Sequence, residues 1–129
     1  MNFQFDMQDS GERDVFPGGA VRDIRTGKGR YDLISPIALR RLALVYERGA
    51  EKYDERNWEK GMYVSRMLDS AMRHIQQHLE GLRDEDHLGH AAFNIFGAIH
   101  IEEMVRRGLL DGQFVDLPDY TGQQTPAEK

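Results

Sequence analysis

The sequence contains no cysteine, and this absence excludes several kinds of site at once. Without cysteine the chain can form no disulfide framework, no thiolate metal site and no thiol nucleophile. Its 5 histidines and 22 acidic residues leave open metal sites that are built from nitrogen and oxygen donors.

The chain also lacks an excess of positive charge. Its 17 Lys and Arg residues are outnumbered by 22 Asp and Glu residues, which gives a formal net charge of -5. Binding of a nucleic-acid polymer needs a positive face, so we expect no such partner, although a small basic patch can still hold phosphates.

Long apolar runs are missing as well. No run approaches the roughly 18 residues that a membrane helix needs, so we expect no membrane contact. Residues 1–10 have neither the basic nor the apolar region of a signal peptide. We therefore expect a cytoplasmic protein.

The length of 129 residues suits one domain with one core. Residues 1–34 are rich in glycine and have little apolar periodicity, which predicts an irregular segment with a basic glycine-rich loop. Residues 35–108 carry three helical patterns, at about 36–53, 64–80 and 86–107, and predict an all-α helical bundle. Residues 109–129 are predicted to form a C-terminal tail, of which about 118–129 is expected to be loose.

The third predicted helix is apolar on almost every side, as is typical of a helix buried inside an assembly. Its polar exceptions, His87, His90 and Asn94, follow a spacing of three and seven residues and therefore lie in one line. Buried polar groups need partners, so this line is either a ligand site or a hydrogen-bonded seam between helices. Since two neighbouring helices cannot cover so much apolar surface, we expect a homodimer or homotetramer.

Carboxylates form a second candidate site. Glu47 and Glu51 are four residues apart, so they lie on one flank of the first predicted helix and can hold a hard cation. A solvated helix face explains the pair equally well. Asp86 is placed to point inward beside His87, although capping of the third helix is the alternative.

Two further segments suggest nucleotide contacts. Residues 25–30 (RTGKGR) combine glycines with Lys28 and Arg30, which suits phosphate binding, although an exposed flexible loop is the default and the spacing is not that of a P-loop. Asn57 and Trp58 offer an amide and a stacking surface, as a base pocket needs, and Trp58 serves equally well as core filler.

The sequence resembles a family of phage proteins named dATP/dGTP diphosphohydrolases, which are themselves similar to the MazG-like nucleotide pyrophosphohydrolases. The resemblance covers about residues 18–103. Its most specific pieces are Lys52-Tyr53, Asn57-Trp58, Arg73-His74 and the segment from His87 to Asn94.

This resemblance implies a MazG-like helical bundle, completed by oligomerisation, that hydrolyses a purine dNTP to the monophosphate and pyrophosphate with Mg²⁺ or Mn²⁺. The wider superfamily holds its metal with an E-x-x-E and an E-x-x-D pair. Here the second pair falls on His87 and His90, and the first falls near His74. Histidine is a poor Mg²⁺ ligand. Either the carboxylates have moved to Glu47, Glu51 and residues 84–86, or the ion is softer, or the protein binds a nucleotide without cleaving it.

On this basis each candidate residue has an expected role. The expected metal ligands are Glu47, Glu51 and Asp86. The expected catalytic residues are His74, His87 and His90. The expected phosphate contacts are Lys28, Arg30, Lys52 and Arg73, and the expected base or ribose contacts are Asn57, Trp58 and Asn94. The expected enzyme reshapes the nucleotide pool of a phage-infected cell; the alternatives are a protein that sequesters a nucleotide and a structural helical oligomer.

Overall fold

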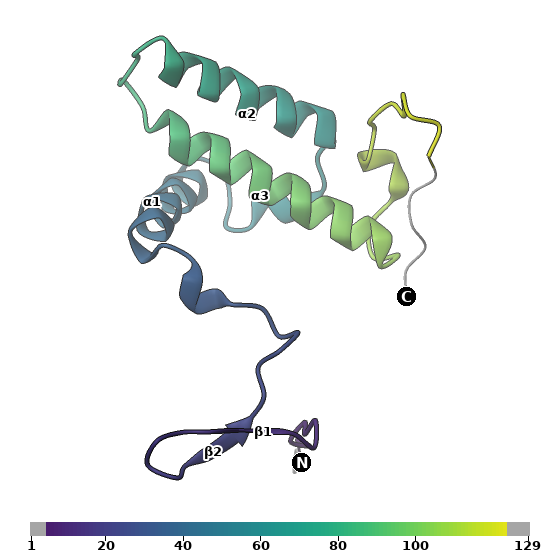
Figure 1. Ribbon diagram of the computed structural model, residues 1–129. Helices are drawn as coiled ribbons and strands as arrows, with labels where there is room; N and C mark the ends of the chain where they lie inside the picture. Colours follow the sequence, from purple (N-terminus) through teal and green to yellow (C-terminus); the bar gives the residue numbers. More distant parts are fainter. Residues whose placement is uncertain (1–4, 124–129) are drawn as a thin grey trace. The chain divides into compact units, whose positions relative to one another are not determined.

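A computed structural model describes residues 5–123 of the chain. The chain divides into two compact units, Met1–Ile34 and Ser35–Lys129 (Figure 1). The described helices are α1 (Pro36–Lys52), α2 (Val64–Leu79) and α3 (His87–Arg106), with short 3-10 turns between and after them. The all-α fold expected from the sequence is therefore confirmed.

The N-terminal unit contains a small β-hairpin where the sequence predicts irregular structure. Strands β1 (Arg13–Val15) and β2 (Val21–Asp23) pair antiparallel, with Arg13 opposite Asp23. Each strand has only three residues and its side chains are mostly exposed, so no alternation of apolar residues marks it in the sequence.

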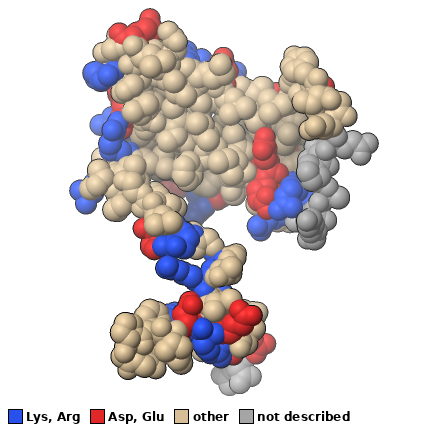
Figure 2. All heavy atoms as spheres, viewed as in Figure 1, with Lys and Arg blue, Asp and Glu red and all other residues tan. Residues whose placement is uncertain are grey.

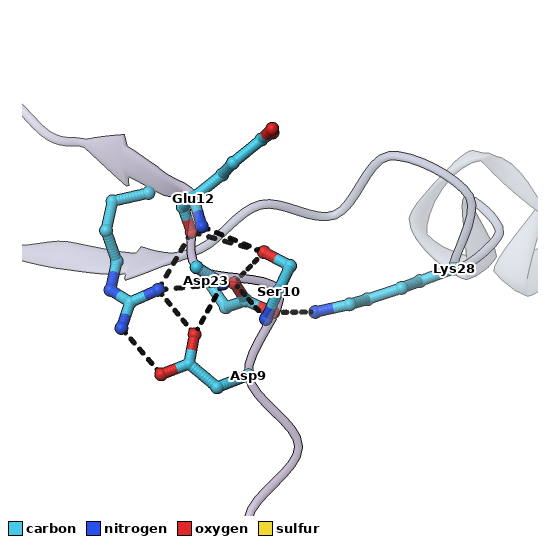
Figure 3. Close-up of polar contacts among 7 residues, drawn as sticks. Asp9, Ser10, Glu12, Asp23 and Lys28 are labelled. Atoms are coloured by element: carbon cyan, nitrogen blue, oxygen red, sulfur yellow. Dashed lines mark hydrogen bonds and ion pairs between the residues drawn. The ribbon is translucent and has the colours of Figure 1, made fainter.

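Polar contacts around the Asp23 carboxylate close this hairpin (Figure 3). Ser10 donates to Asp23 from its backbone N–H and from its hydroxyl, and the Lys28 Nζ lies 2.9 Å from the same carboxylate. These hydrogen bonds, with that of the Ser10 hydroxyl first, lower the pKa of Asp23 to about 2. The Lys28 side chain thus links the basic loop to Asp23, the last residue of β2.

The helix ends follow local capping signals. Ser35 accepts a hydrogen bond from the Ala38 N–H, at 3.1 Å, and Pro36 occupies the first helical position. Asp86 caps α3 by accepting from the Gly89 N–H at 3.0 Å. Gly108, with φ of 73°, ends α3 in a left-handed turn in which the Leu109 N–H bonds the Met104 carbonyl.

The core lies mainly between α2 and α3, which pack side by side (Figure 1). Gly97 lets the two helices approach closely, since a Cβ there would lie 2.5 Å from the Met67 Cε. Helix α1 packs across α3 through Leu42 and Val45. One buried cluster joins α2 and α3 and consists of Val64, Met67, Ala98 and Ile101.

The segment after α3 also packs on this core, within the predicted C-terminal tail but before the stretch expected to be loose. Phe114 and Val115 pack against the core, and Asp116 accepts from the Ser65 N–H, at 2.9 Å, at the start of α2. A 3-10 turn at Gly112–Phe114 positions these residues.

Much apolar surface of the helical unit stays exposed. Phe96 and Ile99 on α3 are 51% and 60% exposed, and Met72 and Leu79 on α2 are 71% and 75% exposed. Figure 2 shows that the visible face over these two helices carries few charged side chains. Among the described helices, none has the length and apolarity needed to cross a membrane.

Candidate functional site

Two histidines meet across the interface between α2 and α3. His74 projects from α2 and His87 is the first residue of α3, and their Nδ1 atoms lie 2.9 Å apart. His87 is only 1% exposed, whereas His74 is half-buried. The pair therefore sits at the buried end of the turn that joins the two helices.

Asp84 fixes the tautomer of His87. Its Oδ1 lies 2.8 Å from the His87 Nε2, and this hydrogen bond lowers the pKa of the Asp84 carboxyl. An ionised carboxylate can only accept, so the His87 Nε2 carries a proton, and in the neutral ring the Nδ1 then carries the lone pair. His74 then donates its Nδ1–H to the His87 Nδ1, and a directed chain runs from His74 through His87 to Asp84.

His90 and Glu85 complete this group of side chains. The His90 ring stacks on the His74 ring with centroids 4.9 Å apart and planes 16° apart. The Glu85 Oε1 lies 4.0 Å from the His90 Nε2. Burial, and then the neighbouring His90, lower the pKa of His74, so its imidazole is neutral at neutral pH.

The same turn brings together donors suited to a metal ion. His74, Glu85 and His87 each offer one ligand atom, and these atoms lie within 4.8 Å of one another. In the part of the chain that the structure describes, no other three His, Asp or Glu side chains meet this condition. Two imidazole nitrogens and one carboxylate oxygen are a donor set that Zn²⁺ and related ions accept.

A depression of about 570 Å³ lies beside these donors, at the start of α3. Its rim carries guanidinium, imidazole and carboxylate groups. The lining residues are Arg41, Arg48, His78, Arg83, Asp84, Glu85, Asp86 and His87. Positive groups beside ionised carboxylates are the pairing that a phosphate–metal complex needs.

Arg41 and Asp86 form an ion pair across this depression. The Arg41 Nε lies 3.0 Å from the Asp86 Oδ2, and its NH2 bonds the other carboxylate oxygen. The hydrogen bonds from Arg41 lower the pKa of Asp86 to about 2. Both oxygens of Asp86 are thus already engaged, by Arg41 and by the backbone of α3.

The three expected metal ligands do not come together. Glu47 and Glu51 are exposed on α1, and neither joins a metal-binding group with Asp86 among the described residues. Of the expected catalytic residues, in contrast, His74, His87 and His90 form one cluster.

The expected base and ribose contacts lie elsewhere in the helical unit. Trp58 packs edge-on against Tyr46 and His100, with ring centroids 5.9 Å and 4.9 Å away. Asn57 begins the 3-10 turn Asn57–Lys60 and is half-buried. Asn94 donates to the His90 carbonyl, at 2.9 Å, and to the Ser70 hydroxyl, at 3.3 Å.

The expected phosphate contacts are engaged in local interactions. Arg73 pairs with Asp69 on the exposed side of α2, and the Lys52 Nζ lies 5.3 Å from the centre of the Tyr53 ring. In the N-terminal unit, Lys28 bonds Asp23 and Arg30 bonds Asp32. Each of these four cations thus has a local partner at the surface, whereas Arg48 and Arg83 line the depression.

Arg41, Arg48 and Arg83 have no role in the assignment from the sequence, and Asp84 and Glu85 enter it only within residues 84–86, as carboxylates that can replace the missing metal ligands. A carboxylate three residues before His87 is the signal that marks Asp84. That signal has meaning only once α3 is known to begin at His87, because the turn decides which carboxylate folds back onto the ring. The arginines carry no comparable signal.

Comparison with known proteins identifies the family. A family model described as dATP/dGTP diphosphohydrolase, N-terminal, matches residues 19–111, and the chain belongs to this family. The matched range includes all three helices and every histidine of the cluster. No curated protein and no solved structure matches the chain.

Proposed function

We propose that this protein hydrolyses purine deoxynucleoside triphosphates to the monophosphate and pyrophosphate, on a MazG-like helical scaffold. The observation that carries the proposal is the meeting of carboxylates, imidazoles and guanidinium groups around one depression at the start of α3. Membership of a family named for dATP/dGTP diphosphohydrolases supports the same reaction.

Arg48 and Arg83 bind the phosphate chain in this proposal. Both line the depression, and neither forms an ion pair with any described carboxylate. Guanidinium groups donate two hydrogen bonds to one phosphate and stay charged at all relevant pH values. Within the helical unit, Lys52 and Arg73 can exchange their present partners for phosphate, and Asn57, Trp58 and Asn94 remain the proposed base and ribose contacts. Lys28 and Arg30 of the N-terminal unit stay predictions from the sequence.

In the reaction, water adds across the anhydride bond between the α and β phosphates. The bond breaks, pyrophosphate leaves, and the water proton passes to a base. His90 is the proposed base, because it lies beside Glu85 at the open side of the cluster and an imidazole titrates near neutral pH. A divalent cation, Mg²⁺ or Mn²⁺ in related chemistry, supplies positive charge to the phosphates and polarises the water.

His74 and His87 hold the His90 ring in position for this step. The chain of hydrogen bonds to Asp84 fixes the His87 ring, and stacking on His74 orients the His90 ring. A base held in one orientation accepts a proton with less reorganisation than a mobile one.

A homodimer or homotetramer is part of the proposal. Exposed Phe96, Ile99, Met72 and Leu79 lie on α2 and α3, where water contact is unfavourable. A second copy that covers these side chains removes that apolar area from water. Light scattering on the purified chain measures the assembly, and a monomer at micromolar concentration contradicts this part.

The enzyme is tested by incubating the protein with each of the four dNTPs and Mg²⁺ or Mn²⁺, followed by anion-exchange chromatography. Monophosphate and pyrophosphate in equal amounts, from dATP or dGTP first, support the proposal. Intact nucleotide recovered from heat-denatured protein supports sequestration instead. If no product forms and no nucleotide raises the melting temperature, both functions are wrong.

A further inference from the structure

We infer that His74, His87 and Glu85 bind one divalent transition-metal ion of the kind that prefers imidazole nitrogen, such as Zn²⁺ or Co²⁺, over Mg²⁺. The inference gives an identity to the cation of the proposed reaction, and it rests on the proposed function only for what the ion does. Whether the ion binds is a separate question with its own measurement.

The spacing of the two imidazoles fits a shared ion. Their Nδ1 atoms are 2.9 Å apart. Two nitrogens that bind one tetrahedral ion at 2.0–2.1 Å lie about 3.3 Å apart, so the two rings must separate by only a few tenths of an ångström. The backbones of α2 and α3 are held by the buried core, so the pair needs no rearrangement of the helices to take up an ion.

Asp84 provides the support that metal-bound histidines need. A metal-ligating histidine usually donates its other N–H to a carboxylate, which fixes the tautomer and leaves the lone pair toward the ion. The His87 Nε2 donates to the Asp84 Oδ1 at 2.8 Å, and the Nδ1 that remains faces His74. Asp84 is therefore a positioning residue for the site.

Glu85 supplies the third ligand from the side exposed to solvent. Its side chain is 51% exposed, and its carboxylate oxygen lies within 4.8 Å of the ligand atoms of both histidines. Three protein ligands leave coordination positions for water or for phosphate oxygens, as open metal sites do.

The donor set decides which ion is preferred. Mg²⁺ demands oxygen ligands and loses its water reluctantly, whereas Zn²⁺ and Co²⁺ accept imidazole nitrogen readily. Only one of the three donors here is an oxygen. An ion between the rings needs a lone pair on the Nδ1 of each, so a proton that His74 holds on Nδ1 moves to its own Nε2.

The test uses the full chain after removal of metal with a chelator, without nucleotide. Isothermal titration calorimetry with Zn²⁺ or Co²⁺ is expected to give one ion per chain and a raised melting temperature. A hundredfold excess of Mg²⁺ is expected to leave this binding in place. His74→Gln and Glu85→Gln are expected to weaken it at least tenfold, and Asp84→Asn by 10–100-fold.

Glu80→Gln is the matched control for Glu85→Gln, since Glu80 is an exposed carboxylate at the end of α2 that lies outside both the group of three and the lining of the depression. Glu85 is exposed, so Glu85→Gln keeps the fold and separates loss of a ligand from loss of structure, which circular dichroism checks. Unchanged Zn²⁺ affinity in both His74→Gln and Glu85→Gln, or equal loss in Glu80→Gln, overturns the inference.

The two proposals fail independently. Zn²⁺ binding that depends on His74 and Glu85, in a protein that cleaves no dNTP, supports the metal site and contradicts the proposed reaction. Cleavage of dNTP by a protein that binds Mg²⁺ as tightly as Zn²⁺ supports the reaction and contradicts the metal site.

Discussion

The Nδ1 atoms of His74 and His87 face each other at 2.9 Å across the interface between α2 and α3. One of them must carry a proton and the other a lone pair, unless an ion lies between them. Asp84 decides which is which, because it accepts the Nε2–H of His87. The site is thus built around one directed chain of polar groups.

The chain of hydrogen bonds from His74 through His87 to Asp84 predicts the tautomers of both rings in metal-free protein at neutral pH. His87 is expected to be protonated on Nε2 and His74 on Nδ1, which long-range ¹H–¹⁵N spectra of the imidazoles measure directly. Asp84→Ala removes the acceptor and is expected to release His87 into a mixture of tautomers. A His87 ring protonated on Nδ1 in the unaltered protein contradicts the arrangement.

The start of α3 should be sensitive to acid because of Asp86. The pKa of Asp86 is held at about 2, against an ordinary value of 3.8, mainly by hydrogen bonds from Arg41. A carboxyl whose pKa is lower in the folded than in the unfolded state stabilises the fold at pH values above its unfolded pKa. This stabilisation is lost as the pH falls from about 4 toward 2. Urea denaturation at a series of pH values measures this loss, which is expected to be smaller in Asp86→Asn.

Two substitutions of Asp86 separate its contribution as a helix cap from its ion pair with Arg41. Asparagine caps helices as well as aspartate does, so Asp86→Asn removes only the pair with Arg41. Asp86→Ala removes both and is expected to cost about 1 kcal/mol more in the free energy of unfolding than Asp86→Asn. Equal stability of the two variants shows that the cap contributes nothing.

Two glycines in helices should respond in opposite directions to alanine. A Cβ at Gly89 would lie 2.7 Å from the Asp86 carboxylate and 3.0 Å from Val45, so Gly89→Ala displaces the Asp86 cap, crowds Val45 of α1 and is expected to destabilise the protein. A Cβ at Gly49 meets nothing within 4 Å, so Gly49→Ala is expected to stabilise by up to about 1 kcal/mol.

Thermal and urea unfolding of both variants measure this contrast. Gly49→Ala is the matched control, since it makes the same substitution within a helix but away from any contact. If Gly89→Ala stabilises the protein as much as Gly49→Ala does, then α1 does not pack on α3 at this point.

The arginines of the depression should govern nucleotide affinity. Arg48→Ala and Arg83→Ala each remove one charged donor beside the cluster and are expected to weaken dGTP binding by about tenfold, as loss of a charged hydrogen bond does. Arg40→Ala, on α1 but outside the lining, serves as control. Calorimetric titration with dGTP measures all three, and equal affinities contradict the placement of the phosphates.

The helices and their ends could be predicted because their signals are local. Ser35 before Pro36, Asp86 before the apolar run and Gly108 after it each act within a few residues of themselves. The hairpin near the N-terminus could not be predicted, because its strands are short and exposed and its contacts to Asp23 come from Ser10 and Lys28, which lie outside the strands.

The site could be predicted only in part for a related reason. The line of His87 and His90 follows from helical spacing alone, and α2 does bring His74 to it. The expected ligand Asp86 is instead engaged by Arg41, 45 residues away in the chain, and no periodicity reveals such a pair. Trp58 likewise finds its ring partners on α1 and α3.

The most direct test of the proposed reaction is product analysis with dATP and dGTP, comparing the unaltered protein with His90→Ala. The account predicts equal amounts of monophosphate and pyrophosphate from the unaltered protein, and a lost rate with retained nucleotide binding in His90→Ala. Release of a deoxynucleoside diphosphate and inorganic phosphate, or an unchanged rate in His90→Ala, would contradict it.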